Sequence, residues 1–145
     1  MLTFVKRINR RRIVNFDKIL ESLKISKMKL RVRSVVMESL SFYQQVKQMS
    51  KTKLFLSNHG AQFVNIIFMQ PYTVVVELFH PRLFKPCYSL IASKASLEYY
   101  SVIEEWIHIN LTECLPIRTS NQPYINCDVY IEEDKLVSYL QKIVL

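Results

Sequence analysis

The sequence predicts an α/β fold, a Rossmann-like parallel sheet with helices on both faces. Short apolar runs alternate along the chain with segments whose apolar residues recur at helical spacing. This alternation is typical of βαβ units and a parallel, doubly wound sheet. Residues 73–79 are apolar at almost every position, as expected for a strand covered on both faces. With 145 residues, 50% of them hydrophobic, and no break in composition, we expect one domain over residues 1–145.

The first half supplies two strands and two helices. Residues 2–6 predict a strand that leads into an arginine-rich segment. Asn15 then suits an N-cap, and a helix follows whose apolar face holds Phe16, Ile19, Leu20 and Leu23. Residues 30–37 are rich in β-branched side chains and predict a second strand. Ser41 and Gln44 have the spacing of a capping box, which predicts a second helix.

The second half continues the alternation. Residues 54–56 predict a short strand, and residues 63–68 predict a helix that ends before Pro71. The strand at residues 73–79 follows. Residues 127–131 and the acidic run after them predict a last strand and a closing helix.

Positive charge is concentrated in the first half of the chain. Residues 1–53 hold 14 Lys and Arg against 3 acids, whereas residues 54–145 hold 6 against 9. Four arginines gather directly after the first predicted strand, at positions 7, 10, 11 and 12. Such clustering suits one compact phosphate better than a long polyanion, although a basic nucleic-acid-binding domain remains an alternative.

Gly60 is the only glycine, and it stands where a predicted strand meets a predicted helix. A glycine there allows a ligand or a backbone to approach closely, and the following helix offers N–H groups to a phosphate. Taken alone, the glycine is explained more simply by a tight βα turn. His59, its neighbour, is the strongest titratable candidate for catalysis. Glu77 is a carboxylate in an otherwise apolar strand, where burial is costly unless a partner binds it.

The absence of their motifs excludes several classes of protein: hydrolases, metalloproteases and classical NAD-binding enzymes. The chain has no phosphate-loop pattern, no G-x-S-x-G and no H-E-x-x-H, and one glycine cannot build a dinucleotide fingerprint. Cys87, Cys114 and Cys127 lack the paired spacing of a zinc site. We expect core or free thiols, with a Cys114–Cys127 pair as the alternative in an oxidising compartment.

Taken together, several blocks of the sequence resemble the C-terminal part of glycosyltransferase family 61. The resemblance is carried by residues 3–7, 11–15, 59–62, 75–79 and 88–92, and by Phe42, Gln45, Val46, Phe68 and Pro71. It covers residues 2–100 strongly and the closing strand and helix loosely. The order and spacing of the blocks make it more specific than any one of them.

The resemblance implies an inverting transferase of the GT-B type, in which the C-terminal Rossmann-like domain holds a nucleotide sugar, here UDP-GlcNAc or UDP-xylose. By resemblance, Arg7 and Arg11 neutralise the diphosphate, and Asn15 belongs to the same binding site. His59, Gly60 and Ala61 approach the donor, and Glu77 holds the ribose or the sugar. No metal or other cofactor is required, and the acceptor is a hydroxyl of a glycan or glycoprotein in the ER or Golgi lumen.

Two departures from the family pattern bear on activity. Asn15-Phe16-Asp17 stands where the family usually has Asn-Glu after the arginines. The N-terminal partner domain is expected to be absent from this chain, and the catalytic base is either His59 or a group of that domain. A non-catalytic domain that holds a nucleotide or a glycan is therefore an alternative to an active transferase.

Overall fold

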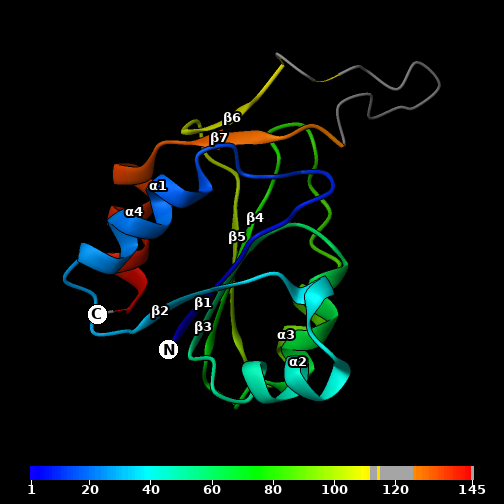
Figure 1. Ribbon diagram of the computed structural model, residues 1–145. Helices are drawn as coiled ribbons and strands as arrows, with labels where there is room; N and C mark the ends of the chain where they lie inside the picture. The colour runs from blue at the N-terminus through cyan, green and yellow to red at the C-terminus, as the bar shows by residue number, and fades with distance from the viewer. Residues whose placement is uncertain (112–113, 115–125, 145) are drawn as a thin grey trace.

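A computed structural model describes residues 1–111, 114 and 126–144 (Figure 1). Its main sheet contains β1 (Leu2–Val5), β2 (Val32–Val35), β3 (Leu54–Asn58), β4 (Val74–Leu78) and β5 (Glu98–Val102). The strand order is β2-β1-β3-β4-β5, and every neighbouring pair runs parallel. The predicted Rossmann-like α/β fold is therefore confirmed. A separate antiparallel pair joins β6 (Ile107–Ile109) to β7 (Val129–Ile131).

Helices cover both faces of the main sheet (Figure 1). One face carries α1 (Phe16–Ile25) and α4 (Glu133–Val144), which contact each other. The other face carries α2 (Phe42–Met49), the 3₁₀ helix η2 (Ala61–Phe68) and α3 (Ser89–Lys94), preceded by the short 3₁₀ turn η1 (Met37–Ser39). The helices predicted after Asn15 and after Ser41 are thus both present.

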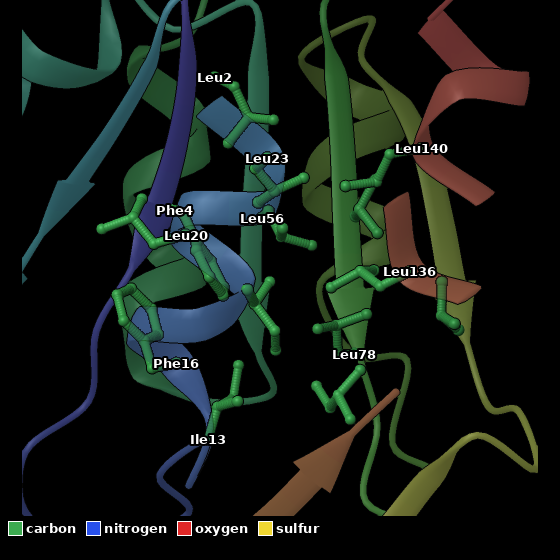
Figure 2. Packing of buried hydrophobic residues seen from close by; sticks show 14 of the residues in the cluster. Leu2, Phe4, Ile13, Phe16, Leu20, Leu23, Leu56, Leu78, Leu136 and Leu140 are labelled. Atoms are coloured by element: carbon green, nitrogen blue, oxygen red, sulfur yellow. The ribbon is translucent and has the colours of Figure 1, made fainter. Parts of the chain in front are cut away.

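The alternation of side chains along β3 divides the core into two layers. Leu54 and Leu56 pack with the residues of α1 and α4, whereas Phe55 packs on the opposite face with Phe63 of η2. Figure 2 shows the first layer, where Phe4 of β1 stacks on Phe16 of α1 with ring centroids 4.1 Å apart. Strands that are apolar on both faces are what a parallel sheet between two helical layers requires.

The local signals at two helix starts gave different results. The capping box of α2 is present, because Gln44 N–H donates to Ser41 Oγ while Ser41 N–H donates to Gln44 Oε1. Asn15 occupies the N-cap position of α1, but its side chain makes no capping bond. It instead bonds the backbone of Ile131 in β7, donating to the carbonyl at 2.6 Å and accepting from the N–H at 3.2 Å.

The sequence patterns do not predict α3, β5 or β6. The segment after Gly60 is helical as predicted, but it winds as a 3₁₀ helix.

Among the described residues, no helix is both long and apolar enough to cross a membrane.

The strand order places a topological switch point between β1 and β3. The chain leaves β1 toward β2 and leaves β3 toward β4, so the two following connections move apart on opposite faces of the sheet. In open parallel sheets, ligands bind in the crevice that such a divergence creates at the carboxyl ends of the strands.

Candidate functional site

The arginine-rich segment after β1 meets the turn after β3 at this switch point. Arg7 Nη1 donates to the carbonyl of His59 at 2.8 Å and to Gln62 Oε1 at 3.2 Å. Arg7 Nε also donates to the carbonyl of Arg10 at 3.1 Å, which folds residues 6–12 into a compact loop, called here the arginine loop. Two segments that are about 50 residues apart in sequence are thereby joined by one guanidinium.

Gly60 is required at this junction because the Arg7 guanidinium packs against it. A Cβ at position 60 would stand 1.8 Å from Arg7 Nη1 and 2.5 Å from Gln62 Oε1. The backbone itself makes no such demand, since φ is 166° and ψ is 175°, an extended conformation that any residue adopts. The close approach that the glycine predicts is therefore made by an arginine of the same chain.

Arg7 and Arg11 are both half-buried and close enough to repel each other. Burial and then the charge of Arg11 lower the pKa of Arg7 to about 10. Burial and the charge of Arg10 lower the pKa of Arg11 as well. Among the described residues, no carboxylate forms a salt bridge with either guanidinium. Glu38 raises the pKa of Arg7 only in part, so burial and the neighbouring arginines dominate at both guanidiniums.

The remaining arginines of the loop have other contacts. Arg12 forms a salt bridge with Asp128, 2.6 Å between Nη2 and Oδ2, and its backbone N–H donates to the same carboxylate. Arg10 is exposed and reaches Asn126 Oδ1 only at 3.5 Å. Val129 N–H donates to the carbonyl of Arg12 at 2.8 Å. The segment before β7 therefore holds the arginine loop in place, and Arg12 is structural.

His59 and Glu77 form a buried pair behind the turn. His59 Nδ1 lies 2.5 Å from Glu77 Oε1, and the Tyr99 hydroxyl of β5 donates to Glu77 Oε2. Glu77 is fully buried, and the exposed fraction of the His59 side chain is 11%. Burial and the hydrogen bond to Glu77 raise the pKa of Tyr99 far above its ordinary value, so the phenol stays a donor. Both carboxylate oxygens are thus occupied within the protein.

Aromatic rings fix the plane of the His59 imidazole. Phe79 stacks on it with ring centroids 5.2 Å apart, and Tyr88 lies against it at 5.7 Å. Tyr88 in turn stacks on Phe63 of η2. This packing leaves His59 few rotamers, so the ring is held in one orientation.

Of the residues predicted for the site, the structure brings Arg7, Arg11, His59, Gly60 and Glu77 into one neighbourhood. Ala61 begins η2 beside them and is exposed. Asn15 stands apart from this group, since its amide is engaged by the backbone of β7. Their roles in binding stay predictions.

Sequence reasoning missed Tyr99, Gln62, Asn58 and His80 as members of this neighbourhood. Gln62 Nε2 donates to the carbonyl of Asn58 at 2.6 Å and so braces the turn. His80, which no sequence motif singles out, lies just beyond β4 and is 5% exposed. The strand-end position of Asn58 was the one available signal, whereas nothing in the sequence pairs Tyr99 with Glu77.

Two hollows adjoin the arginine loop. A polar one of about 260 Å³ lies between the loop and the segment before β7, with Asn9, Arg10, Asn126 and Asp128 in its lining. A much smaller cavity of about 10 Å³ is lined in part by Asn58 and His80. No group of three or more potential metal-binding side chains is found among the described residues.

Of the two expectations for the cysteines, the structure shows the alternative, in which Cys114 and Cys127 are paired and are not free thiols. Cys114 and Cys127 form a disulfide with a Cα–Cα distance of 5.4 Å, and Cys87 is free and exposed. Because Cys127 directly precedes Asp128, the disulfide anchors the segment that holds the arginine loop.

The comparisons with known proteins give one family. The chain matches the model of the family described as Glycosyltransferase 61 over residues 2–76, just over half of its length. That stretch contains the arginine loop, the turn at Gly60 and most of β4. A search of the curated proteins finds no match. Given the family match, the chain belongs to glycosyltransferase family 61.

Proposed function

We propose that this chain binds a UDP-linked sugar at the β1–β3 switch point, as the donor-binding part of an inverting glycosyltransferase. The observation that carries the proposal is the Arg7–Arg11 pair, two half-buried guanidiniums that form no salt bridge among the described residues. A diphosphate placed between them would relieve their repulsion. Guanidinium groups are suited to this role because they offer paired donors to phosphate oxygens.

The same arrangement supports departure of the nucleotide without a metal ion. When a sugar is transferred, the bond from its anomeric carbon to the diphosphate oxygen breaks and negative charge develops on the leaving UDP. Fixed cations at that position stabilise the charge in the transition state. We therefore propose that Arg7 and Arg11 perform this task and that no metal cofactor is needed.

His59 is the proposed base for the acceptor hydroxyl. With Glu77 accepting from Nδ1, the neutral imidazole keeps a lone pair on Nε2. That nitrogen would take the hydroxyl proton as the acceptor oxygen bonds to the anomeric carbon from the face opposite UDP. Glu77 then serves to orient His59, because its full burial and its two occupied oxygens favour positioning over direct contact with the ribose or sugar.

The finer identity rests on resemblance. In sequence, residues 59–62 and 75–79 most resemble the protein O-mannose β-1,4-N-acetylglucosaminyltransferase. They also resemble the EGF-domain O-GlcNAc transferase and plant xylosyltransferases. We accordingly propose UDP-GlcNAc or UDP-xylose as donor and a glycan or glycoprotein hydroxyl as acceptor. The Cys114–Cys127 disulfide supports an oxidising compartment such as the ER or Golgi lumen. A second Rossmann-like domain would complete the cleft.

Titration calorimetry with UDP tests the binding step. We expect wild-type protein to bind UDP and Arg7→Met to bind it at least about 10-fold more weakly, because a charge-assisted contact to phosphate is lost. Arg33→Met is the matched control, since Arg33 is exposed on the edge strand β2. Equal losses in both variants, or no UDP binding in wild type, would contradict the proposal.

A competition experiment distinguishes UDP binding from the alternative, nucleic-acid binding. If single-stranded RNA binds more tightly than UDP, with an affinity that falls steeply as salt rises, the basic half of the chain serves a polyanion instead. We expect UDP binding to depend much less on salt, because only two arginines contact the ligand.

A further inference from the structure

Three residues that each carry an unpaired buried polar atom line one small cavity beside the arginine loop. Among the described residues, Arg11 Nε, Asn58 Oδ1 and His80 Nε2 are the buried side-chain nitrogens and oxygens without a hydrogen-bond partner in the protein. All three residues line the same cavity of about 10 Å³. Asn58 and His80 are only 6% and 5% exposed. Buried polar groups are seldom left unpaired, so their convergence calls for a ligand.

The hydrogen bonds around Asn58 fix which atom it turns to the cavity. Its Nδ2 donates to the carbonyl of Arg11 at 3.0 Å. Exchanging the two ends of the amide would place its carbonyl oxygen against that backbone carbonyl, two acceptors with no proton between them. Asn58 therefore presents an acceptor, Oδ1, to the cavity.

The neighbourhood of His80 fixes its tautomer in the same way. The backbone N–H of Arg82 donates to His80 Nδ1 at 3.2 Å, so this nitrogen carries the lone pair and Nε2 carries the proton. Burial, followed by the charges of Arg82 and Arg11, lowers the pKa of His80, which agrees with a neutral ring. His80 Nε2 and Arg11 Nε are consequently both donors.

The cavity thus needs a ligand that accepts two hydrogen bonds and donates one. An anion has no proton for Asn58 Oδ1, and a cation would be repelled by Arg11. The volume is close to that of one water-sized sphere. We propose that a single buried water molecule binds here, accepting from Arg11 Nε and His80 Nε2 and donating to Asn58 Oδ1.

This water would tie together the arginine loop, the end of β3 and the segment after β4. Arg11 has φ of 55°, a left-handed conformation that is uncommon outside glycine and needs support from its surroundings. Asn58 Nδ2 and the Asn126 carbonyl hold this backbone through the carbonyl and the N–H of Arg11, and a water bonded to Arg11 Nε would fix the guanidinium as well. His80 then becomes a positioning residue for Arg11. This last consequence rests on the proposed function, whereas the water site itself does not.

A crystal structure of the whole chain at about 1.5 Å resolution tests the site directly. We expect one oxygen peak within about 3.2 Å of all three atoms. A cavity without such a peak, or one whose three polar atoms pair with protein groups instead, would overturn the proposal.

Two substitutions of His80 add a solution test. His80→Gln keeps an N–H donor toward the cavity and should retain the peak, whereas His80→Phe removes the donor and should lose it. We expect the melting temperature of His80→Phe to lie about 4 °C below that of His80→Gln. The matching pair at His108, an exposed residue that contacts Glu132, should show no such difference. Equal melting temperatures for the two His80 variants would also overturn the proposal.

Measurements of UDP affinity test separately whether His80 positions Arg11 for nucleotide binding. If UDP binds as proposed, His80→Phe should weaken it about 3- to 10-fold relative to His80→Gln, the range expected for one lost hydrogen bond. If Arg7→Met leaves UDP binding unchanged, the proposed function fails, and the oxygen peak still decides the water site. A retained peak with equal UDP affinities would overturn the positioning role of His80.

Discussion

Gly60 and Arg7 depend on each other at the scale of single atoms. The guanidinium lies where the first side-chain carbon of any other residue would stand. Because the backbone at Gly60 is extended, alanine causes no backbone strain there. The flexible end of the Arg7 side chain can move, so the clash is relieved by displacing Arg7 from the carbonyl of His59.

We therefore predict that Gly60→Ala leaves the fold intact and weakens UDP binding about 10-fold, because Arg7 no longer points at the switch point. Circular dichroism and calorimetry with UDP measure the two effects. In the Arg7→Met background the same substitution should cost nothing further, as expected for two residues that act through one contact. Additive losses would show that Gly60 contacts the nucleotide itself.

His80 makes the free energy of unfolding depend on pH. Its pKa is lowered in the fold by burial and by the charges of Arg82 and Arg11, so the native state favours the neutral ring. The stability from neutral His80 is present in full above the unfolded pKa of about 6.5 and is lost as pH falls through the lowered folded value. We expect wild type to lose more free energy of unfolding than His80→Gln between about pH 7.5 and pH 5. Urea titrations at both pH values measure this; parallel losses would contradict it.

At the scale of elements, the segment before β7 acts as a clamp on the arginine loop. Asn126 accepts from the backbone N–H of Arg11, Asp128 pairs with Arg12, and Val129 bonds the backbone on either side of Ile13. The Cys114–Cys127 disulfide ties this clamp to the chain after β6. The geometry of the candidate site therefore depends on an element that lies outside the region of the family match.

Cys114→Ser tests the clamp. Because the two cysteines are separated by 13 positions in sequence, loss of the crosslink should lower the free energy of unfolding by about 3 kcal/mol. It should also weaken UDP binding, because the arginine loop loses its anchor. Cys87→Ser is the control, since Cys87 is exposed and unpaired. Denaturant unfolding of both variants measures the difference, and matching midpoints would count against the clamp.

At the scale of the whole molecule, β3 holds the two core layers together. It lies in the middle of the sheet, and each of its five residues is buried. Its side chains reach both helical layers, and its carboxyl end carries Asn58, His59 and Gly60. The stability of the core and the geometry of the candidate site therefore both depend on β3.

We predict that Leu56→Ala lowers the free energy of unfolding by about 2–5 kcal/mol, because a fully buried leucine leaves a cavity. Val64→Ala on η2 should cost less than about 1 kcal/mol, since Val64 is 49% exposed. Urea unfolding compares the two. Similar costs would mean that the core relaxes around position 56.

The sequence alone determined the parallel βαβ arrangement, the two-faced core and the places of Arg7 and His59 directly after strands and of Glu77 within one. These follow from periodicity and strand order, which are local properties or direct consequences of parallel topology. It did not predict α3, β5 or β6. The six-residue α3 is too short to show a helical period, and β5 ends a sheet at its exposed edge, where the apolar pattern weakens.

Only the tertiary structure decided which side chains touch. The bonds of Arg7 to the His59 turn, of Tyr99 to Glu77 and of Asn15 to β7 join residues far apart in the chain, and no local pattern specifies such pairs. For the same reason, the sequence marked Gly60 as a place of close approach but could not show that Arg7 makes it. The spacing of residues fixes the edge at which they meet, whereas packing across the sheet fixes their partners.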